Sequence, residues 1–251
     1  MNIKPRIENE IAHGEYVAEK GEEVWNWSSP AGHLRWQRRV DMFREFLGSS
    51  LNYEEGGGNK KVLEIGCGTG LFTEQLALTE HQIVAIDISS TLLNLAKKRI
   101  NRSNVVFEKE DAHKTSFGND SFDFIVGSSA LHHLDSGAAL KEFFRILKPG
   151  GKIMFTEPNM LNPQIAVQKN IPFIKKLAGD SPDEKAFIKW SLKKILAGNG
   201  FIDIFIENFD FLHPAIPKFL LSYAGRLCVM MEYIPVLKEI SGSLVIKAGK
   251  P

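Results

Sequence analysis

The sequence predicts an α/β protein built on a doubly wound, mostly parallel sheet. Between residues 61 and 157, short apolar runs of strand length alternate with stretches in which apolar residues recur at helical spacing. Several of the short runs end at glycine or aspartate, which is typical of buried parallel strands that lead into a loop. Hydrophobic residues make up 43% of the chain, enough to cover both faces of such a sheet.

Strands are expected where an apolar run is bounded by glycine or polar residues. In chain order these runs are 62–65, 83–86, 105–107, 122–126, 153–155, 201–206 and 242–247. Apolar residues at helical spacing lie between the earlier runs, at 70–78, 92–100 and 140–147. The pattern therefore predicts seven strands, with helices on both faces of the sheet.

A further helix is expected to begin at Ser181, before the sixth strand. Ser181 stands where an N-cap would, Pro182 takes the first helical position, and Glu184 has the place of a capping-box acid. Apolar residues at helical spacing follow over 188–196, and the Gly-Asn-Gly run at 198–200 would end the helix.

Composition and charge exclude several classes of protein. The 31 Lys and Arg residues balance the 30 Asp and Glu residues, so we expect no nucleic acid bound through a basic surface. Two cysteines cannot form a disulfide framework, and charges near the N-terminus interrupt the apolar run that a secretory signal needs. We therefore expect a cytoplasmic protein without a membrane span.

A glycine-rich turn follows the first predicted strand. Gly66 and Gly68 allow a tight turn and let a ligand approach the backbone. Asp87 ends the second strand, where a carboxylate can accept hydrogen bonds from the hydroxyls of a ribose. A dinucleotide fingerprint would need glycine at position 71, but the chain has leucine there and its third glycine, Gly70, comes one residue early. The pattern predicts a nucleoside-containing cofactor.

The glycine turn and the features after it resemble the class I S-adenosylmethionine-dependent methyltransferases. Residues 64–70 resemble the first motif of that family, and four further features follow in order: Asp87 with Ile88, Glu110 to Ala112, 122–134 and 147–151. The resemblance covers about residues 61–157. It implies S-adenosylmethionine as the cofactor, the strand order 3-2-1-4-5-7-6, and an antiparallel seventh strand.

The resemblance also implies which residues bind the cofactor. Glu64 would bind the cofactor's amino group or order the glycine turn, and an arginine on the N-terminal segment would pair with the cofactor's carboxylate. The full set consists of strand-end residues and that arginine: Arg35, Glu64, Gly66, Cys67, Gly68, Asp87, Ile88, Asp111, Ala112 and Ser128.

Three residues near the ends of the fourth and fifth strands are candidate catalytic residues. His132 and His133 follow the fourth strand, and an imidazole there is suited to deprotonate a hydroxyl acceptor, with His132 preferred. Glu157 would assist His132 or orient the acceptor. Packing or capping roles for the histidines, and a solvated or capping role for Glu157, are the simpler alternatives. No metal is expected, because adjacent histidines should diverge and no third ligand stands at suitable spacing.

We expect a single methyltransferase domain over residues 1–251. Its segments are expected to form a helical lid (1–52), a linker (54–59), the cofactor-binding core (61–157), a first acceptor roof (159–180) and a second acceptor roof (208–240). Both roof segments leave the sheet at the cofactor edge and are apolar, which favours a small or lipid-like acceptor. The candidate histidine base favours oxygen as the methylated atom.

Three other interpretations stay open on the sequence alone. The apolar roof residues and their flanking lysines are also suited to peripheral contact with a membrane that carries a lipid-like acceptor. A second interpretation is an NAD(P)-dependent oxidoreductase of Rossmann type. A third is a catalytically silent relative that binds the cofactor as a partner subunit. The oligomeric state is not determined by the sequence.

Overall fold

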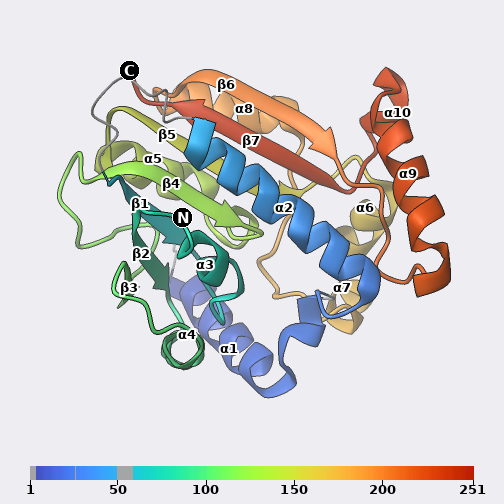
Figure 1. Ribbon diagram of the computed structural model, residues 1–251, viewed down its shortest axis with the longest axis horizontal. Helices are drawn as coiled ribbons and strands as arrows, with labels where there is room; N and C mark the ends of the chain where they lie inside the picture. Colours follow the sequence, from blue (N-terminus) through green and yellow to red (C-terminus); the bar gives the residue numbers. More distant parts are fainter. Residues whose placement is uncertain (1–3, 26, 50–58) are drawn as a thin grey trace.

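A computed structural model describes residues 4–25, 27–49 and 59–251 of the chain. Its described residues contain a seven-stranded sheet in the order β3-β2-β1-β4-β5-β7-β6, as the sequence predicts (Figure 1). The strands are β1 (Lys61–Ile65), β2 (Gln82–Asp87), β3 (Val105–Lys109), β4 (Phe122–Ser128), β5 (Leu147–Pro158), β6 (Ile202–Phe209) and β7 (Ser243–Gly249). Strand β7 runs antiparallel to both of its neighbours, and the other neighbouring pairs are parallel.

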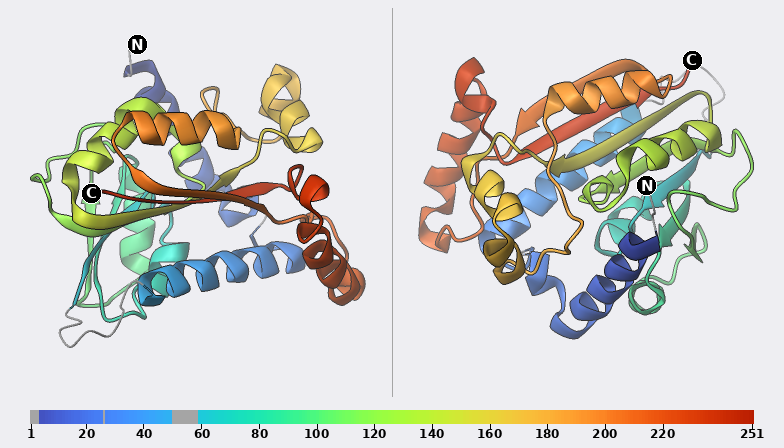
Figure 2. Two further views of the ribbon diagram at one scale, coloured as in Figure 1. Left: turned by 90° about the horizontal axis from the view of Figure 1, so that it is seen from above. Right: turned by 180° about the vertical axis from the view of Figure 1, so that it is seen from behind.

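Helices cover both faces of the sheet, because alternate strand residues point to opposite sides. The helices are α1 (Lys4–Lys20), α2 (Pro30–Ser49), α3 (Leu71–Leu76), α4 (Ser90–Arg99), α5 (Ser136–Ile146), α6 (Pro163–Asn170), α7 (Pro172–Leu177), α8 (Lys189–Gly198), α9 (Leu221–Glu232) and α10 (Pro235–Lys238). Figure 2 shows α5 and α8 on one side of the sheet and α2 on the other. Leu63 of β1 is buried against the first side and Val62 against the second.

The helix expected from Ser181 begins eight residues later, at Lys189, so this prediction is wrong at its start. The capping contact itself forms, since the Ser181 amide donates to Glu184 Oε1 at 2.7 Å. However, Phe187 is drawn into a bridge with Asn159 beyond the end of β5, and its amide donates to the Pro158 carbonyl at 2.9 Å. A backbone that bonds to a strand end in this way cannot make the hydrogen bonds of a helix.

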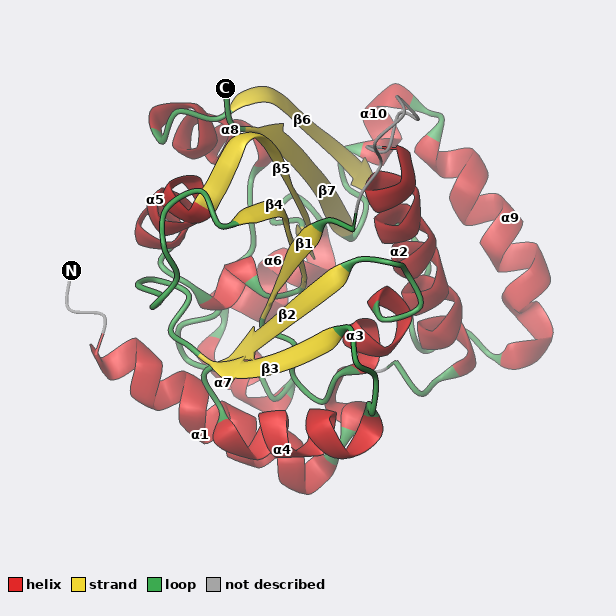
Figure 3. Cartoon of the chain, turned by 60° about the vertical axis from the view of Figure 1, so that its left-hand side comes forward, coloured by secondary structure: helices red, strands yellow, loops and turns green. Residues whose placement is uncertain are grey.

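The two segments predicted to form a roof differ in the structure. Helices α6 and α7 and residues 178–180 stand beside the carboxyl ends of the strands, whereas α9 and α10 lie at the outer edge, beside α2 (Figure 3). Exposed apolar side chains on the outer part of the second segment include Phe219 (83%), Tyr223 (73%) and Val236 (84%). Most of the apolar residues of α9 and α10 therefore face away from the site.

Two further sequence expectations concern the N-terminal lid with its linker, and membrane-spanning helices. Most of the linker predicted at 54–59, and both ends of the lid predicted at 1–52, lie outside the described residues. Among the helices that the structure describes, none has the length and apolar character needed to cross a membrane.

Candidate functional site

A cavity of about 760 Å³ opens at the carboxyl ends of the parallel strands. The turn after β1 and the ends of β2 and β4 form its floor, and α1, residues 162–169 and residues 210–215 form its walls. All of the predicted site residues except Glu64 and Glu157 line it. The topology therefore gathers into one cavity residues that are up to 98 positions apart in sequence, from Arg35 to His133 (133 − 35 = 98).

The glycine turn has the geometry that only glycine adopts freely. Gly66 and Gly68 have φ angles of 65° and 55°, in the left-handed region. A Cβ at Gly66 would lie 3.0 Å from the Cβ of Ala130, so a side chain there would push against the start of the histidine turn. The bare backbone forms a cradle on the cavity floor that fits the close approach of a nucleoside cofactor.

Asp87 is anchored to this turn through its carboxylate. Its Oδ2 accepts the Gly68 amide at 2.9 Å, and its Oδ1 accepts the Ser89 amide at 2.8 Å. Burial raises the pKa of Asp87, and the two amides only partly offset the effect of burial. Each oxygen keeps a further lone pair for a ligand hydroxyl, so the carboxylate can bind a ribose without leaving its place.

Glu64 lies beneath the cavity rather than in its wall. It is 3% exposed, and its Oε2 has no hydrogen-bond partner among the described residues. Burial raises its pKa to about 7. The structure therefore places the side chain under the cavity floor and out of the cavity itself.

Arg35 lines the cavity wall from α2. Its Nε donates to Asp210 Oδ2 at 2.8 Å, and the same oxygen accepts from Arg39 at 2.9 Å. Both guanidinium groups lie over the Trp27 ring, at 5.6 Å and 5.2 Å from its centroid. Asp210 thus holds Arg35 in the cavity wall.

His132 is held from behind by Glu157. The imidazole Nδ1 lies 2.7 Å from Glu157 Oε2, and the glutamate also accepts the backbone amides of residues 130, 131 and 132. Glu157 is 1% exposed and does not reach the cavity. This carboxylate therefore positions the histidine and caps its turn, and does not itself meet the acceptor.

His133 lies among carboxylates on the other side of the same turn. Its Nδ1 lies 2.8 Å from Glu10 Oε2 and 3.8 Å from Glu184 Oε1. Burial alone would lower the pKa of His133, but Glu10, Glu184 and Glu157 raise it to about 9. Burial alone would raise the pKa of Glu184, but His133, His132 and Lys169 hold it well below its usual range.

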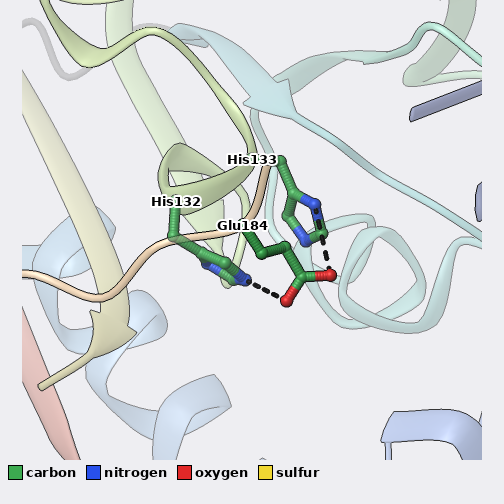
Figure 4. Close-up of side chains that lie close together, drawn as sticks. All are labelled: His132, His133 and Glu184. Carbon is green, nitrogen blue, oxygen red and sulfur yellow. Dashed lines mark ion pairs between the residues drawn. The ribbon is translucent and has the colours of Figure 1, made fainter. Parts of the chain in front are cut away.

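The expectation that the two adjacent histidines diverge is wrong. One ring nitrogen of each lies within 4.8 Å of the other and of a carboxylate oxygen of Glu184 (Figure 4). The third group, Glu184, stands 51 positions after His133 (184 − 133 = 51), so no local spacing reveals it. The sequence assigned Glu184 to a helix cap instead.

Other residues of this cluster were also missed by the sequence analysis. Glu10 and His13 lie one turn apart on α1, and Lys169 lies on α6. Lys169 Nζ contacts Glu184 Oε2 at 2.5 Å and Asp180 Oδ2 at 2.8 Å. The Glu10–His13 spacing places both on one helix face, but nothing in the sequence indicates which surface that face meets.

Comparison with known proteins agrees with this geometry. The family profile described as "Methyltransferase domain" matches residues 63–155. A demethylmenaquinone methyltransferase from Staphylococcus epidermidis is 27% identical over 218 residues, which cover 77% of this chain and 85% of that protein. Phosphoethanolamine N-methyltransferase 1 of Triticum aestivum is 31% identical over 153 residues, 59% of this chain and 30% of that protein.

Solved structures share the fold. A possible histamine N-methyltransferase from Thermotoga maritima has a TM-score of 0.58 at 20% identity, covering 91% of this chain and 99% of that one. Phosphoethanolamine N-methyltransferase 2 of Haemonchus contortus, in complex with phosphomonomethylethanolamine and S-adenosylhomocysteine, has a TM-score of 0.57 at 20% identity. The match covers 83% of this chain, which spans about half of that protein (52%).

The matched domain lies on the strands that carry the glycine turn, Asp87 and the histidine turn. The order of the sheet and its antiparallel seventh strand agree with the same assignment. Residues 63–155 form a methyltransferase domain, and the chain is an S-adenosylmethionine-dependent methyltransferase with the class I fold.

Proposed function

We propose that this enzyme methylates an oxygen nucleophile of a small or lipid-like acceptor, bound at the histidine end of the cavity. The observation that carries the proposal is the pair formed by His132 and Glu157. A buried carboxylate 2.7 Å from Nδ1 keeps the other ring nitrogen directed into the cavity. Hydroxyl acceptors need such a group because they are poor nucleophiles until they lose a proton. His132 is the proposed catalytic residue and Glu157 its positioning residue, with His133 beside them.

The cofactor would lie across the floor of the cavity. S-adenosylmethionine supplies an electrophilic methyl group when bound. We propose that the glycine turn and Asp87 hold its nucleoside, and that Arg35 binds its carboxylate. The other proposed contacts line the same floor or support it from below: Glu64, Cys67, Ile88, Asp111, Ala112 and Ser128.

The composition of the cavity walls supports a small acceptor of mixed polarity. Ile165, Phe211 and Leu212 provide apolar surface, and Gln164 and His213 provide polar groups. The relatives named for demethylmenaquinone and phosphoethanolamine also favour small molecules over macromolecules as acceptors. The neutral net charge of +1 gives no support for a nucleic-acid acceptor.

Contact with a membrane is part of the lipid-like version of this proposal. Helices α9 and α10 and the turn between them carry exposed apolar side chains, among them Met230 (66%), Tyr233 (82%) and Val236 (84%). Exposed apolar patches of this kind on soluble domains mark interaction surfaces. Co-sedimentation with vesicles that contain anionic lipid tests this: we expect binding, and its loss when Tyr233 and Val236 are both changed to serine. Wild-type protein that stays in the supernatant would remove the membrane contact.

The function itself is tested with the purified full chain and S-adenosylmethionine. A panel of phenols, quinols and aliphatic alcohols, with primary amines of similar size, is assayed for formation of S-adenosylhomocysteine and methylated product. We expect turnover of hydroxyl acceptors, and a loss of about 100-fold or more in kcat for His132→Asn with unchanged S-adenosylhomocysteine binding. Turnover of amines alone would contradict the proposal, as would wild-type activity in His132→Asn.

A further inference from the structure

The two histidines of the turn and Glu184 form a cluster in which two ring nitrogens and a carboxylate face one another, all within 4.8 Å. Glu157 accepts a hydrogen bond at His132 Nδ1, which assigns the proton of a neutral imidazole to that nitrogen. His132 Nε2 then carries a lone pair, and it lies 3.8 Å from the Glu184 carboxylate oxygen Oε2. Two electron-rich atoms at this separation favour a cation between them.

His133 presents a second nitrogen to the same place. Its Nδ1 is buried, 2.8 Å from Glu10 Oε2 and 3.8 Å from Glu184 Oε1. The two imidazole rings are 4.2 Å apart, and Figure 4 shows both directed at the carboxylate of Glu184. All three residues line the cavity, so a ligand between them would be open to an acceptor.

We propose that His132, His133 and Glu184 bind a divalent first-row transition-metal ion, with a coordination position left open toward the cavity for the acceptor oxygen. Two imidazoles and one carboxylate suit Zn²⁺, Co²⁺, Fe²⁺ or Mn²⁺. Ligand atoms around tetrahedral zinc lie roughly 3.4 Å apart, from bond lengths of about 2.0–2.1 Å. The observed nitrogen–oxygen separations are 3.8 Å, and all three ligand atoms lie within 4.8 Å of one another, so the side chains must move closer together on binding.

The surroundings of the cluster resemble those of metal sites. A ligating histidine usually donates its other N–H to a carboxylate, which fixes the ring and raises its basicity. Glu157 stands in that relation to His132, at 2.7 Å. Glu184 is fixed by the Ser181 amide at 2.7 Å and by Lys169 at 2.5 Å. Glu10 adds a negative charge next to His133, which a divalent ion would offset.

The contact between Lys169 and Glu184 supports a second explanation of the cluster, namely an ion-pair network without a metal ion. The lysine already supplies one positive charge to the carboxylate, so the cluster could be an ion-pair network and nothing more. The metal site and the ion-pair network differ in a measurable way, since only the metal site predicts inner-sphere nitrogen ligands on an added metal ion.

The role of the ion in catalysis rests on the proposed function. A metal ion that binds the acceptor hydroxyl lowers its pKa. The O–H proton would pass to solvent, the oxygen would form its bond to the methyl carbon, and the sulfur–carbon bond would break with its electron pair staying on sulfur. His132 would then act as a ligand, and Glu157 would still orient it.

The test measures metal binding by the chelator-treated full chain, without cofactor or acceptor. Zn²⁺ is titrated by calorimetry, and Co²⁺ is followed by its visible absorption, which reports nitrogen ligands. We expect one ion per chain, binding weakened by more than about 100-fold in His133→Gln and Glu184→Gln, which lose a ligand, and by about 10–100-fold in Glu157→Gln. His81→Gln and Glu142→Gln replace a buried histidine and a buried glutamate that do not line the cavity, and should bind as the wild type does.

Two results would overturn the proposal. One is the absence of Co²⁺ absorption and of Zn²⁺ binding in wild-type protein that still binds S-adenosylhomocysteine, which would leave the ion-pair network only. The other is equal loss of binding in the control variants, which would show that the ion binds elsewhere. S-adenosylhomocysteine binding checks that each variant is folded. Metal binding without turnover of any hydroxyl acceptor would leave the site in place and reject the proposed function.

Discussion

Glu157, a buried residue near the end of β5, contacts the imidazole of His132, which lines the cavity. The glutamate ends β5 and accepts three backbone amides of the histidine turn, and its Oε2 lies 2.7 Å from the imidazole Nδ1. The strand therefore fixes both the turn and the ring that it carries. Whether His132 acts as a base or as a ligand, its free nitrogen is directed by this contact.

Glu157→Gln should lower kcat by about 10–100-fold and leave KM for S-adenosylmethionine nearly unchanged. The amide is close in shape to the carboxylate but is neutral, so it cannot stabilise positive charge on the imidazole. The split between kcat and KM distinguishes a positioning role from a loss of structure. Glu142→Gln is the matched control, because Glu142 is also a buried glutamate, 8% exposed, but lies outside the cavity. An equal loss of kcat in both variants would contradict the positioning role.

Gly66→Val should weaken S-adenosylhomocysteine binding by at least about tenfold. A side chain at this position is strained, because φ is 65°, and its Cβ meets Ala130 at 3.0 Å. Calorimetric titration measures the effect. Gly225→Val is the control, since a Cβ at Gly225 on α9 meets nothing within 4 Å and should leave the affinity unchanged. Unchanged affinity in Gly66→Val would mean that the cofactor does not lie against this turn.

The free energy of unfolding should depend on pH through Glu64. Burial raises its pKa from the usual 4.5 to about 7, so the folded protein binds this proton more tightly than the unfolded chain does. The stability that it contributes is complete below pH 4.5 and is lost as the pH rises through 7. The glutamine in Glu64→Gln does not titrate, so this variant does not lose that stability. The free energy of unfolding of Glu64→Gln minus that of the wild type should therefore increase by on the order of 3 kcal/mol between pH 4.5 and 8.

Urea unfolding at several pH values, without cofactor, measures this difference. A stability difference between Glu64→Gln and wild type that stays constant over this range would show that Glu64 titrates normally in the folded protein.

Asp210→Asn should destabilise the protein by about 3–5 kcal/mol, because it leaves a buried arginine without its charge partner. Arg39 is 3% exposed, and burial lowers its pKa to about 10 against the attraction of Asp210. Asp120→Asn is the control: Asp120 pairs with Lys250 at 2.7 Å but is half exposed, so its loss should cost less than about 1 kcal/mol. Equal losses in the two variants would contradict a structural role for the Arg39–Asp210 pair.

The sheet and the cofactor turn could be predicted because their signals are local. Glycines with positive φ and an acidic residue at a strand end are required by the turn itself, so they stand at fixed spacing in the sequence. The strand order was implied by the family resemblance, and the structure has it.

The acceptor end could not be predicted in the same way, because it is assembled from distant segments. Glu184 has the local pattern of a helix cap, and its contact with Ser181 does form, yet the backbone hydrogen bonds of Phe187 to the end of β5 prevent the helix. Glu10 reaches His133 only because α1 packs across the cavity. Neither hydrophobic periodicity nor motif spacing in the sequence predicts a contact between such distant segments.

A crystal structure with S-adenosylhomocysteine bound tests the central claim most directly, namely that the cofactor's reacting end faces the histidine cluster. The account predicts that the ribose hydroxyls contact Asp87 and that the sulfur is directed at the space bounded by His132, His133 and Glu184. A sulfur directed away from this cluster, with the ribose elsewhere in the cavity, would contradict it.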